Sequence, residues 1–563
     1  MPRYLIPFDS SSLPHRFTDV LVIGSGAAGL RAAIAASRHA DVTVITKDEL
    51  KESNTDRAQG GIAAAFAPDD SVEQHIADTL AVGCGLCDRP AVDFVVGQGP
   101  DHIRELATWG ARFDLEHGRF DLAREGGHAH PRVVHAQGDA TGAEVQRVLT
   151  RRLKQTPNIR QIEHTFAIDL LTLDNTCLGA VTWSHARGIT LIWAKTVILA
   201  TGGAGRVYRE TTNPRIATGD GLAIAHRAGC ELRDLEFVQF HPTTLYVAGA
   251  ARVLISEAVR GEGGILRNKL GERFMSKYSP MKELAPRDLV SRAILTEMQH
   301  TGDTNVYLDV THVDPARLAV RFPFIKEMCS LFDINISEDL IPVCPSAHYL
   351  IGGVATDLTG RTTVDRLHAC GEVACTGLHG ANRLGSNSLL EGLVLGRSTG
   401  DAAGADAARL PPPAPRRPRG APKPSTSTTS EARSAAPCGA TSASSATPHC
   451  SPARSNASPS GPATSWNASL KPPAAGESRT CSPSPNSSRG SRSTAKRAAA
   501  FTSARTSPSR APRSGTASSR QSGERGTSGN AATSTRARVQ SHRRRTPGHR
   551  DTSPRQPPRL LTR

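Results

Sequence analysis

The strongest constraint on the fold is a short apolar strand that runs into a glycine-rich turn and then a helix. Residues 19–23 (DVLVI) are apolar, Gly24-Ser25-Gly26-Ala27-Ala28-Gly29 follows at once, and the Ala-rich stretch to residue 40 predicts a helix. Residues 42–46 read as a second β-branched strand, and a strand–helix–strand unit predicts a parallel sheet buried on both faces. The glycines allow a tight turn, and the helix N-terminus favours a phosphate. The sequence therefore predicts a Rossmann-like dinucleotide site.

Two dinucleotides suit such a turn, and the sequence favours FAD over NAD. NAD-binding units place an acidic residue at the end of the second strand, where it binds the adenosine ribose. Thr46 and Lys47 stand there instead. A chance Gly-rich turn is the alternative, and the strand and helix that flank the motif argue against it.

The pattern of apolar and polar residues changes twice more along the chain. Residues 196–200 read as another buried strand, residues 239–352 are polar with short helical patterns, and residues 367–371 return to a strand followed by Gly. We therefore predict an α/β fold in which a Rossmann-like FAD-binding domain is split into residues 1–238 and 353–400. The inserted residues 239–352 would form an α+β capping domain. Ligands usually bind in the cleft that such an insertion creates.

Residues 401–563 differ abruptly from the rest in composition. They hold 27 Lys and Arg against 6 Asp and Glu, so the net charge of +16 for the whole chain leaves residues 1–400 at −5. They contain no Ile, Tyr or Met. Such a segment buries too little apolar surface to offset its conformational entropy, which predicts a disordered, basic, low-complexity tail.

The origin of this tail has two readings. Arg dominates over Lys, which is typical of a GC-rich gene translated out of frame, and we expect a frameshift. The alternative is a nucleic-acid-binding tail, but aromatic residues that could stack on bases are not interleaved, so no nucleic-acid partner is expected. Sequencing the locus for an intact downstream frame separates the two.

The remaining composition predicts a cytoplasmic protein without a membrane partner. The N-terminus lacks the apolar stretch of a signal peptide, and no run approaches the roughly 20 apolar residues of a membrane helix. The 11 cysteines are scattered, which suits a reducing compartment. Cys84 and Cys87 have the spacing of half a zinc site, but no second pair follows, so incidental buried thiols are favoured and no metal is expected.

Seven motifs recur together, and in this order, in one protein family. They are residues 54–63 (NTDRAQGGIA), 200–205 (ATGGAG), 241–243 (HPT), 260–264 (RGEGG), 348–353 (HYLIGG), 371–372 (GE) and 382–391 (NRLGSNSLLE). From about residue 19 to residue 400 the chain resembles the flavoprotein family of succinate dehydrogenase, fumarate reductase and L-aspartate oxidase.

The resemblance implies which residues hold FAD. Glu372 would accept hydrogen bonds from cofactor hydroxyls, with a helix-capping carboxylate as the alternative. Ser388 and Leu389 would direct the N–H groups and the positive dipole of a helix start at the flavin N1/C2=O edge. Asn54 stands where the membrane-bound relatives carry the His that links FAD covalently, so FAD should be bound non-covalently here. The other implied cofactor residues are Gly24, Ser25, Gly26, Ala27, Ala28, Gly29, Lys47, Thr55, Gln59, Gly60, Gly61 and Gly202.

A dicarboxylate needs a cationic or hydrogen-bonding group at each end, and the resemblance implies two such pairs. His348 and Arg383 would bind one carboxylate. His241 and Ser256 would bind the other, where the family often has Thr in place of Ser. Each His taken alone is more often a structural residue.

The resemblance also implies a catalytic group. Arg287 would lie at the catalytic centre, and Glu257 and Arg260 would form a proton path to it. Because Arg is a poor base, this role depends on burial and on a neighbouring carboxylate. The alternative for Arg287 is a surface salt bridge with Asp288.

One loop favours the aspartate-oxidising members of the family. Arg124-Glu125-Gly126-Gly127-His128 matches their version of the loop, and Glu125 would pair with the substrate ammonium, with an exposed loop salt bridge as the alternative. We expect an FAD-dependent enzyme that oxidises L-aspartate to iminoaspartate with O2 or fumarate as acceptor. The resemblance implies that this is the first step of quinolinate and NAD biosynthesis, with quinolinate synthase as a partner. The alternatives are a soluble fumarate reductase or succinate-oxidising flavoprotein, and a non-catalytic, basic-tailed binding protein.

Overall fold

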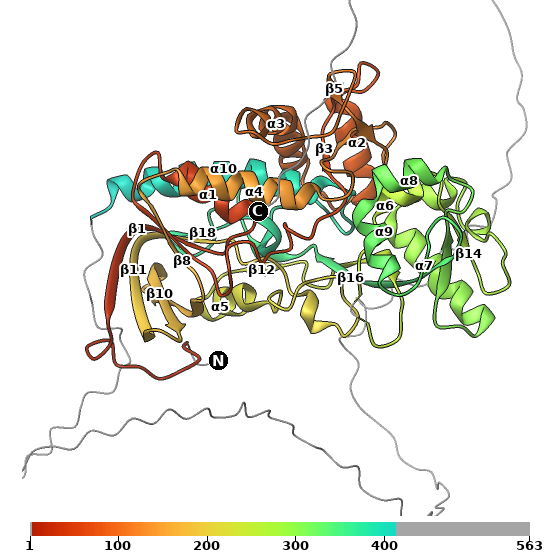
Figure 1. Ribbon diagram of the computed structural model, residues 1–563. Helices are drawn as coiled ribbons and strands as arrows, with labels where there is room; N and C mark the ends of the chain where they lie inside the picture. Colours follow the sequence, from red (N-terminus) through yellow and green to blue (C-terminus); the bar gives the residue numbers. More distant parts are fainter. Residues whose placement is uncertain (1–2, 251, 412–563) are drawn as a thin grey trace, which may run out of the picture. The chain divides into compact units, whose positions relative to one another are not determined.

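The computed structural model describes residues 3–250 and 252–411, and its largest element is a seven-stranded sheet in the order β8-β2-β1-β11-β10-β9, with β18 beside β11 (Figure 1). β8, β2, β1, β11 and β18 are mutually parallel, whereas β10 runs antiparallel to both of its neighbours, β11 and β9. One edge of β11 is shared, because its first half pairs with β10 and its last three residues pair with β18. The strands are β1 (His15–Ile23), β2 (Val42–Ile45), β8 (Ile159–Ile162), β9 (Phe166–Leu173), β10 (Thr176–Ser184), β11 (Gly188–Leu199) and β18 (Leu367–Ala369).

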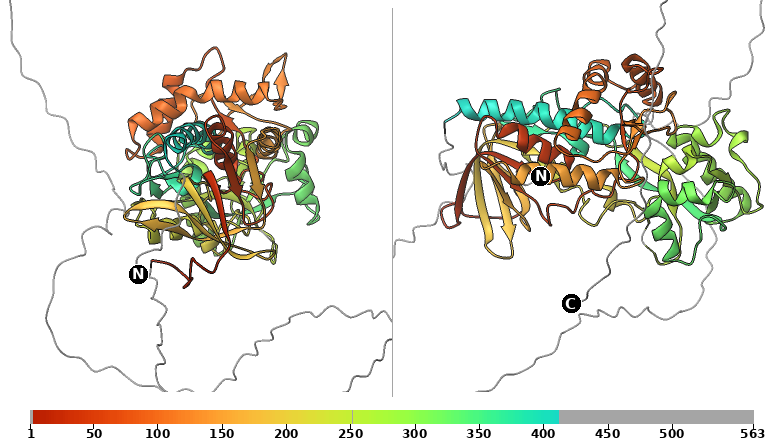
Figure 2. Two further views of the ribbon diagram at one scale, coloured as in Figure 1. Left: turned by 90° about the vertical axis from the view of Figure 1, so that its left-hand side faces the viewer. Right: turned by 45° about the horizontal axis from the view of Figure 1, so that its top comes forward.

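Three helices cover one face of this sheet, as Figures 1 and 2 show. They are α1 (Ala27–Ala36), α4 (Thr141–Lys154) and α10 (Asn387–Arg409). α2 (Val72–Val82) and α3 (Arg89–Thr108) pack together, α3 against α10, and α5 (Asp220–Ala228) packs on β9. The predicted strand–turn–helix–strand unit is confirmed. The helix ends at Ala36 rather than at residue 40, because residues 37–40 form the turn that leads into β2.

α10 lies directly on α1 along a stripe of glycines spaced four residues apart. Gly392, Gly396, Gly400 and Gly404 face α1, and a Cβ at Gly396 would lie 2.8 Å from the carbonyl oxygen of Ala28. A Cβ at Gly404 would lie 2.8 Å from the oxygen of Ala36, and one at Gly400 would overlap that of Ala32. The absence of side chains on this face of α10 lets the two backbones approach closely and fixes both helices on the sheet.

The start of the predicted disordered tail at residue 401 is wrong. α10 continues to Arg409, and Ala403 and Ala407 are buried. The prediction relied on the small number of large apolar residues after residue 400. Ala and Gly are small, but they suit a close helix–helix contact and can be buried there. The rest of the predicted tail lies outside the described residues.

A second, antiparallel sheet is formed by strands between Val238 and Leu350. It has the order β13-β16-β15-β14 and packs with α7 around a core that includes Phe274 and Phe322. β13 begins and β16 ends close to the predicted boundaries of the capping domain, and the division itself stays a prediction. The elements are β13 (Val238–Leu245), β14 (Ile265–Arg267), β15 (Val306–Asp309), β16 (Ile341–Leu350), α6 (Glu257–Gly261), α7 (Arg287–Thr301), α8 (Pro315–Arg321) and α9 (Pro323–Ser330).

Short strands complete the described part. β12 and β19 flank β17, β7 lies between β3 and β6, and β4 pairs with β5. Their bounds are β3 (Ile62–Ala63), β4 (Leu115–Glu116), β5 (Arg119–Phe120), β6 (Leu122–Ala123), β7 (Val133–Val134), β12 (Leu232–Arg233), β17 (Gly353–Ala355) and β19 (Ala374–Cys375).

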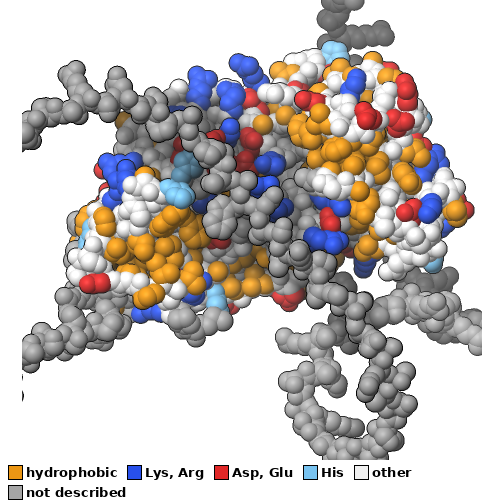
Figure 3. All heavy atoms as spheres, turned by 60° about the horizontal axis from the view of Figure 1, so that its bottom comes forward, with side chains coloured by type: hydrophobic (Ala, Val, Ile, Leu, Met, Phe, Trp, Pro, Cys, Tyr) orange, Lys and Arg blue, Asp and Glu red, His pale blue; other side chains and the backbone are white. Residues whose placement is uncertain are grey.

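The surface of the described residues is mixed in character. Figure 3 shows one face on which hydrophobic side chains gather in two areas, with Lys and Arg side chains between them. Large exposed apolar side chains include Val207, Leu270, Val320 and Leu331. Within the described ranges no helix combines the length and the hydropathy that crossing a bilayer requires.

Candidate functional site

A large cavity opens at the carboxyl ends of the parallel strands, between the N-termini of α1 and α10. Its volume, taken as the space open to the centre of a water-sized molecule, is about 220 Å³. Ligands of open α/β sheets bind at this edge. Most of the predicted cofactor residues line it, whereas Gly29, Gln59, Gly60 and Gly61 do not. Those that line it are Gly24, Ser25, Gly26, Ala27, Ala28, Lys47, Asn54, Thr55, Gly202, Glu372, Ser388 and Leu389.

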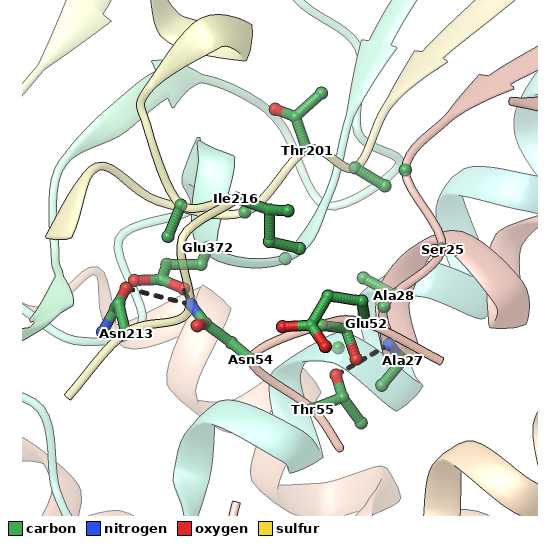
Figure 4. Close-up of a pocket in the computed structure, with 18 of the residues that line it drawn as sticks. Ser25, Ala27, Ala28, Glu52, Asn54, Thr55, Thr201, Asn213, Ile216 and Glu372 are labelled. Carbon is green, nitrogen blue, oxygen red and sulfur yellow. Dashed lines mark hydrogen bonds between the residues drawn. The ribbon is translucent and has the colours of Figure 1, made fainter. Parts of the chain in front are cut away.

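The turn after β1 leaves the N-terminus of α1 open to the cavity. Gly24 has φ +117°, and a Cβ there would overlap the carbonyl oxygen of Ala200, so only Gly fits. The backbone N–H of Ala27 donates to Thr55 Oγ1 at 2.9 Å (Figure 4). The N-cap residue of α1 is Gly26, which has no side chain to cap the helix. The remaining N–H groups of its first turn are therefore free to bind a diphosphate.

A polar cluster occupies the middle of the cavity wall. Asn54 Nδ2 donates to Glu372 Oε2 at 2.9 Å and to Asn213 Oδ1 at 3.1 Å, and Figure 4 shows the three side chains together. Glu372 Oε1 accepts the backbone N–H of Leu350 at 3.1 Å, and burial raises the pKa of this carboxyl. The carboxylate therefore lies at the cavity wall and does not cap a helix, which was the alternative interpretation.

Lys47 lies at the end of β2 with its ammonium already paired. Its Nζ forms an ion pair with Asp220 at the start of α5 and donates to Thr218 Oγ1 at 2.9 Å. Both Lys47 and Asp220 line the cavity. The predicted place of Lys47 near the adenosine end stays a prediction.

The N-cap residue of α10, Ser386, also makes no side-chain capping hydrogen bond. It has φ +60°, and its hydroxyl points to Glu125 and donates to Oε2 at 2.9 Å. Ser388 and Leu389, in that turn, line the cavity. Two open helix N-termini thus face one cavity. This arrangement fits FAD, which presents a diphosphate and a ring system that gains negative charge on reduction.

Gln59 and Gly60 sit behind the cavity wall. Gln59 Nε2 donates to the backbone oxygen of Leu254 at 2.8 Å, whereas its Oε1 is buried without a partner in the described residues. A Cβ at Gly60 would lie 2.6 Å from Glu125 Oε1. Gly60 therefore makes room for Glu125.

Two buried guanidinium groups meet near the α10 end of the cavity, at Gln239. Gln239 Oε1 accepts from Arg287 Nη1 at 3.1 Å and from Arg383 Nη2 at 3.0 Å. The Gln239 amide donates in turn to Asn382 Oδ1 and to the backbone oxygen of Arg383, which fixes the orientation of the amide. Burial, followed by the charge of Arg287, lowers the pKa of Arg383 to about 10.

Two histidines lie beside these arginines because β13 pairs with β16. The pairing places Gln239 opposite Tyr349 and His241 opposite Ser346, and the ring centroids of His241 and His348 are 5.1 Å apart. Burial and the charge of Arg287 hold the pKa of both imidazoles well below the ordinary value. Both are therefore neutral hydrogen-bonding groups at neutral pH.

A buried acidic pair adjoins Arg287. Glu257 Oε2 accepts from Arg287 Nε at 2.6 Å, and its other oxygen accepts from Arg260 Nη2 at 2.7 Å. Although burial alone would raise the pKa of Glu257, Arg287 and Arg260 hold it below the ordinary value. Glu125 lies 4.0 Å from Arg287, and burial together with the charge of Glu257 raises its pKa. The pKa values of the two carboxyls are therefore shifted in opposite directions.

The geometry also excludes the surface salt bridges that were the alternative interpretations of Arg287 and Glu125. Arg287 pairs with Glu257 and not with Asp288, whose carboxylate binds Arg292. Glu125 is 1% exposed, so it is not a surface loop ion pair. Ser256 Oγ accepts the Ala258 N–H at 3.3 Å and caps α6.

Cys84 and Cys87 are not the buried thiols that the sequence suggested, because Cys84 is exposed and Cys87 is half-buried. The described residues contain no cluster of three or more His, Cys, Asp or Glu side chains arranged to hold a metal.

The sequence reasoning missed three residues of the site. Gln239 joins the two arginines, Tyr349 lies against Arg383, and Asn213 completes the polar cluster of the cavity wall. Neutral polar side chains and a Tyr inside a strand carry no recognisable chemical signature. The only signal for Gln239 and Tyr349 was their proximity in the sequence to His241 and His348, and Asn213 had no such signal.

Comparison with known proteins identifies the family to which the chain is similar. The model of a family described as FAD binding domain matches residues 19–389. L-aspartate oxidase 2-b, chloroplastic, of Nicotiana tabacum is 48% identical over 396 residues, which cover 68% of this chain and 61% of that protein. L-aspartate oxidase of Streptomyces coelicolor is 48% identical over 413 residues, which cover 70% of this chain and 71% of that protein. The chain thus spans about 61% of the length of the tobacco relative.

Solved structures of two flavoprotein relatives have a similar fold. A quinol fumarate reductase from E. coli superposes with a TM-score of 0.67 at 38% identity, covering 70% of this chain and 71% of that chain. Sdh1 from Mycobacterium smegmatis superposes with a TM-score of 0.62 at 36% identity, covering 72% of this chain and 70% of that chain.

Proposed function

Since the chain belongs to the FAD binding domain family, we propose that it is an FAD-dependent oxidase that converts L-aspartate to iminoaspartate. O2 or fumarate would accept the electrons. The observation that carries this proposal is the meeting of Arg287 and Arg383 at Gln239, next to the buried carboxylate of Glu125. L-aspartate carries two carboxylates and one ammonium, and this cluster offers two cations and one carboxylate.

Each end of the substrate has a candidate partner. Arg383 and His348 line the cavity and bind one carboxylate. His241, with Ser256 on the neighbouring segment, binds the other. Glu125 pairs with the ammonium. This assignment explains why Glu125 is held in place by Ser386, which belongs to the cofactor side of the site.

Oxidation of the ammonium form removes the C2 hydrogen with its electron pair and two protons from nitrogen, one before hydride loss and one from the resulting iminium. When bound, FAD would supply the hydride acceptor, and the electrons would pass on to O2, giving H2O2, or to fumarate, giving succinate. The chain's own residues orient the C2–H bond, exclude water and handle the proton. Burial raises the pKa of Glu125, so its carboxyl is suited to hold the ammonium proton. Arg287 neutralises substrate charge, and Glu257 with Arg260 connects it to a proton path.

The chemistry of the product indicates which reaction must follow this one. An imine in water hydrolyses, so a following enzyme that condenses it must take it up promptly. We propose quinolinate synthase as that enzyme, in the biosynthesis of NAD. FAD is bound non-covalently in this proposal, because Asn54 cannot form the covalent link.

Anaerobic flavin bleaching tests the proposal. FAD-loaded protein mixed with L-aspartate without O2 should lose its flavin absorption, and fumarate should restore it. L-asparagine, in which one carboxylate is replaced by a neutral amide, is the matched control and should leave the flavin oxidised. Bleaching by succinate but not by aspartate would establish the succinate-oxidising alternative. A chain that takes up no flavin would contradict the enzyme assignment altogether.

A further inference from the structure

Arg383 is a buried cation without an acidic partner among the described residues. Only 3% of its surface is exposed, and no described Asp or Glu forms an ion pair with it. Arg287 and Arg260, the neighbouring buried arginines, both bind Glu257. An unpaired buried charge is costly unless other groups compensate it. The surroundings of Arg383 must therefore stabilise its charge by other means.

The hydrogen-bond acceptors of the guanidinium are neutral, although the charges of Arg287, Glu372 and Glu125 act on it from nearby. Gln239 Oε1 accepts from Arg383 Nε and Nη2 at 3.3 and 3.0 Å, and Ser388 Oγ accepts from Nη1 at 2.6 Å. The guanidinium carbon lies 4.4 Å from the centroid of the Tyr349 ring, within the range of a cation–π interaction. These three hydrogen bonds leave two of the five N–H groups of the side chain for a ligand.

A carboxylate lies behind the Tyr349 ring. The Tyr349 hydroxyl donates to Glu391 Oε2 at 3.0 Å, and the same oxygen lies 3.1 Å from His379 Nε2. Thr376 Oγ1 donates to Glu391 Oε1 at 2.6 Å. Although burial alone would raise the pKa of Glu391, His379 and Thr376 hold it below the ordinary value. A phenol that donates to an ionised carboxylate carries a more electron-rich ring, which attracts a cation more strongly.

We propose that Tyr349 and Glu391 are positioning residues that keep Arg383 charged, oriented and free to take a substrate carboxylate. Because the ring contacts the face of the guanidinium, this contact leaves two of its N–H donors free. The charges of Glu372 and Glu125 also favour the cation. A carboxylate bound directly to Arg383 would compete with the substrate. The inference rests on the proposed function, which assigns Arg383 to one end of a dicarboxylate.

The dissociation constant of succinate tests this arrangement. It is measured by the change in flavin absorption on the full chain loaded with FAD, after equal flavin content has been verified, because Tyr349 also lines the cavity. Tyr349→Leu, which removes the ring, should weaken succinate binding about tenfold. Tyr349→Phe and Glu391→Gln, which keep the ring, should weaken it only about threefold. Tyr246→Leu is the matched control, because Tyr246 stacks on Arg252 at the same 4.4 Å, and should leave the constant unchanged.

A double-mutant cycle separates positioning from mere core packing. In an Arg383→Met background, Tyr349→Leu should change the dissociation constant of succinate less than about twofold, because the ring acts through the guanidinium. Equal losses in both backgrounds would overturn the inference, as would unchanged succinate binding in Tyr349→Leu. If the unmodified, FAD-loaded chain binds neither succinate nor L-aspartate, the proposed function fails and this inference with it.

Discussion

Glu125 lies where the substrate end of the cavity meets the N-terminus of α10. Its carboxylate accepts the Ser386 hydroxyl at 2.9 Å and lies 4.0 Å from Arg287. A buried carboxyl whose pKa is raised by desolvation and by Glu257 gains most from a cation placed beside it. The ammonium of aspartate is such a cation, whereas succinate and fumarate carry none.

Glu125→Gln should therefore harm aspartate oxidation selectively. Loss of a charged hydrogen bond of about 1.5–3 kcal/mol lowers kcat/KM for L-aspartate roughly 10- to 100-fold. The rate of fumarate reduction should stay within about twofold. Both rates are measured on the same FAD-loaded preparation, with the exposed Glu116→Gln as the matched control. Equal losses in both reactions would remove Glu125 from the recognition of the ammonium.

At the scale of residues, the His and Arg side chains of the site could be predicted from the sequence. The uncharged residues that hold them in place could not. His241, His348, Arg287 and Arg383 stand in recognisable motifs, and the structure brings them together. Gln239 does not stand out, because an amide in a strand is common and its role appears only when β13 pairs with β16. That pairing is long-range, and no local pattern determines its register.

At the scale of elements, the contact between α1 and α10 fixes where both helix N-termini point. Each helix begins at the cavity, and the glycine stripe of α10 sets their separation. Displacing α10 would move Ser388 and Leu389 relative to Gly26 and Ala27. The stripe therefore supports both the stability of the fold and the dimensions of the cofactor site.

Gly400→Ala should be destabilising, against the usual trend. In an exposed helix, replacing Gly with Ala stabilises by about 1 kcal/mol. At Gly400 the new Cβ would overlap the carbonyl oxygen of Ala32, and overpacking of this kind costs about 1–3 kcal/mol. Urea unfolding should show a lower free energy of unfolding for Gly400→Ala. Gly97→Ala is the matched control, since Gly97 lies in α3 with no atom within 4 Å of such a Cβ, and should be stabilising. A stabilising Gly400→Ala would contradict the close contact.

The elements themselves were predictable where periodicity and turn chemistry agreed. The unit of β1, α1 and β2 follows from apolar runs and from glycines that admit no side chain, such as Gly24. The end of α10 was not predictable from composition, because small residues that suit a helix–helix contact look the same as those of a low-complexity segment.

At the scale of the molecule, residues from both sheets contribute to the site. The parallel sheet and its helices provide the diphosphate end, and β13 and β16 of the second sheet provide His241, His348 and Gln239. Arg383 joins them, because it lines the cavity while binding Gln239. The central claim of this account is that a short diacid is held between these groups at the α10 end of the cavity.

A crystal structure of the FAD-loaded protein with L-aspartate bound under anaerobic conditions tests that claim most directly. The account predicts one carboxylate on Arg383 and His348, the other near His241, and the ammonium facing Glu125. A ligand held elsewhere, with Arg287 and Arg383 turned away from it, would contradict the account.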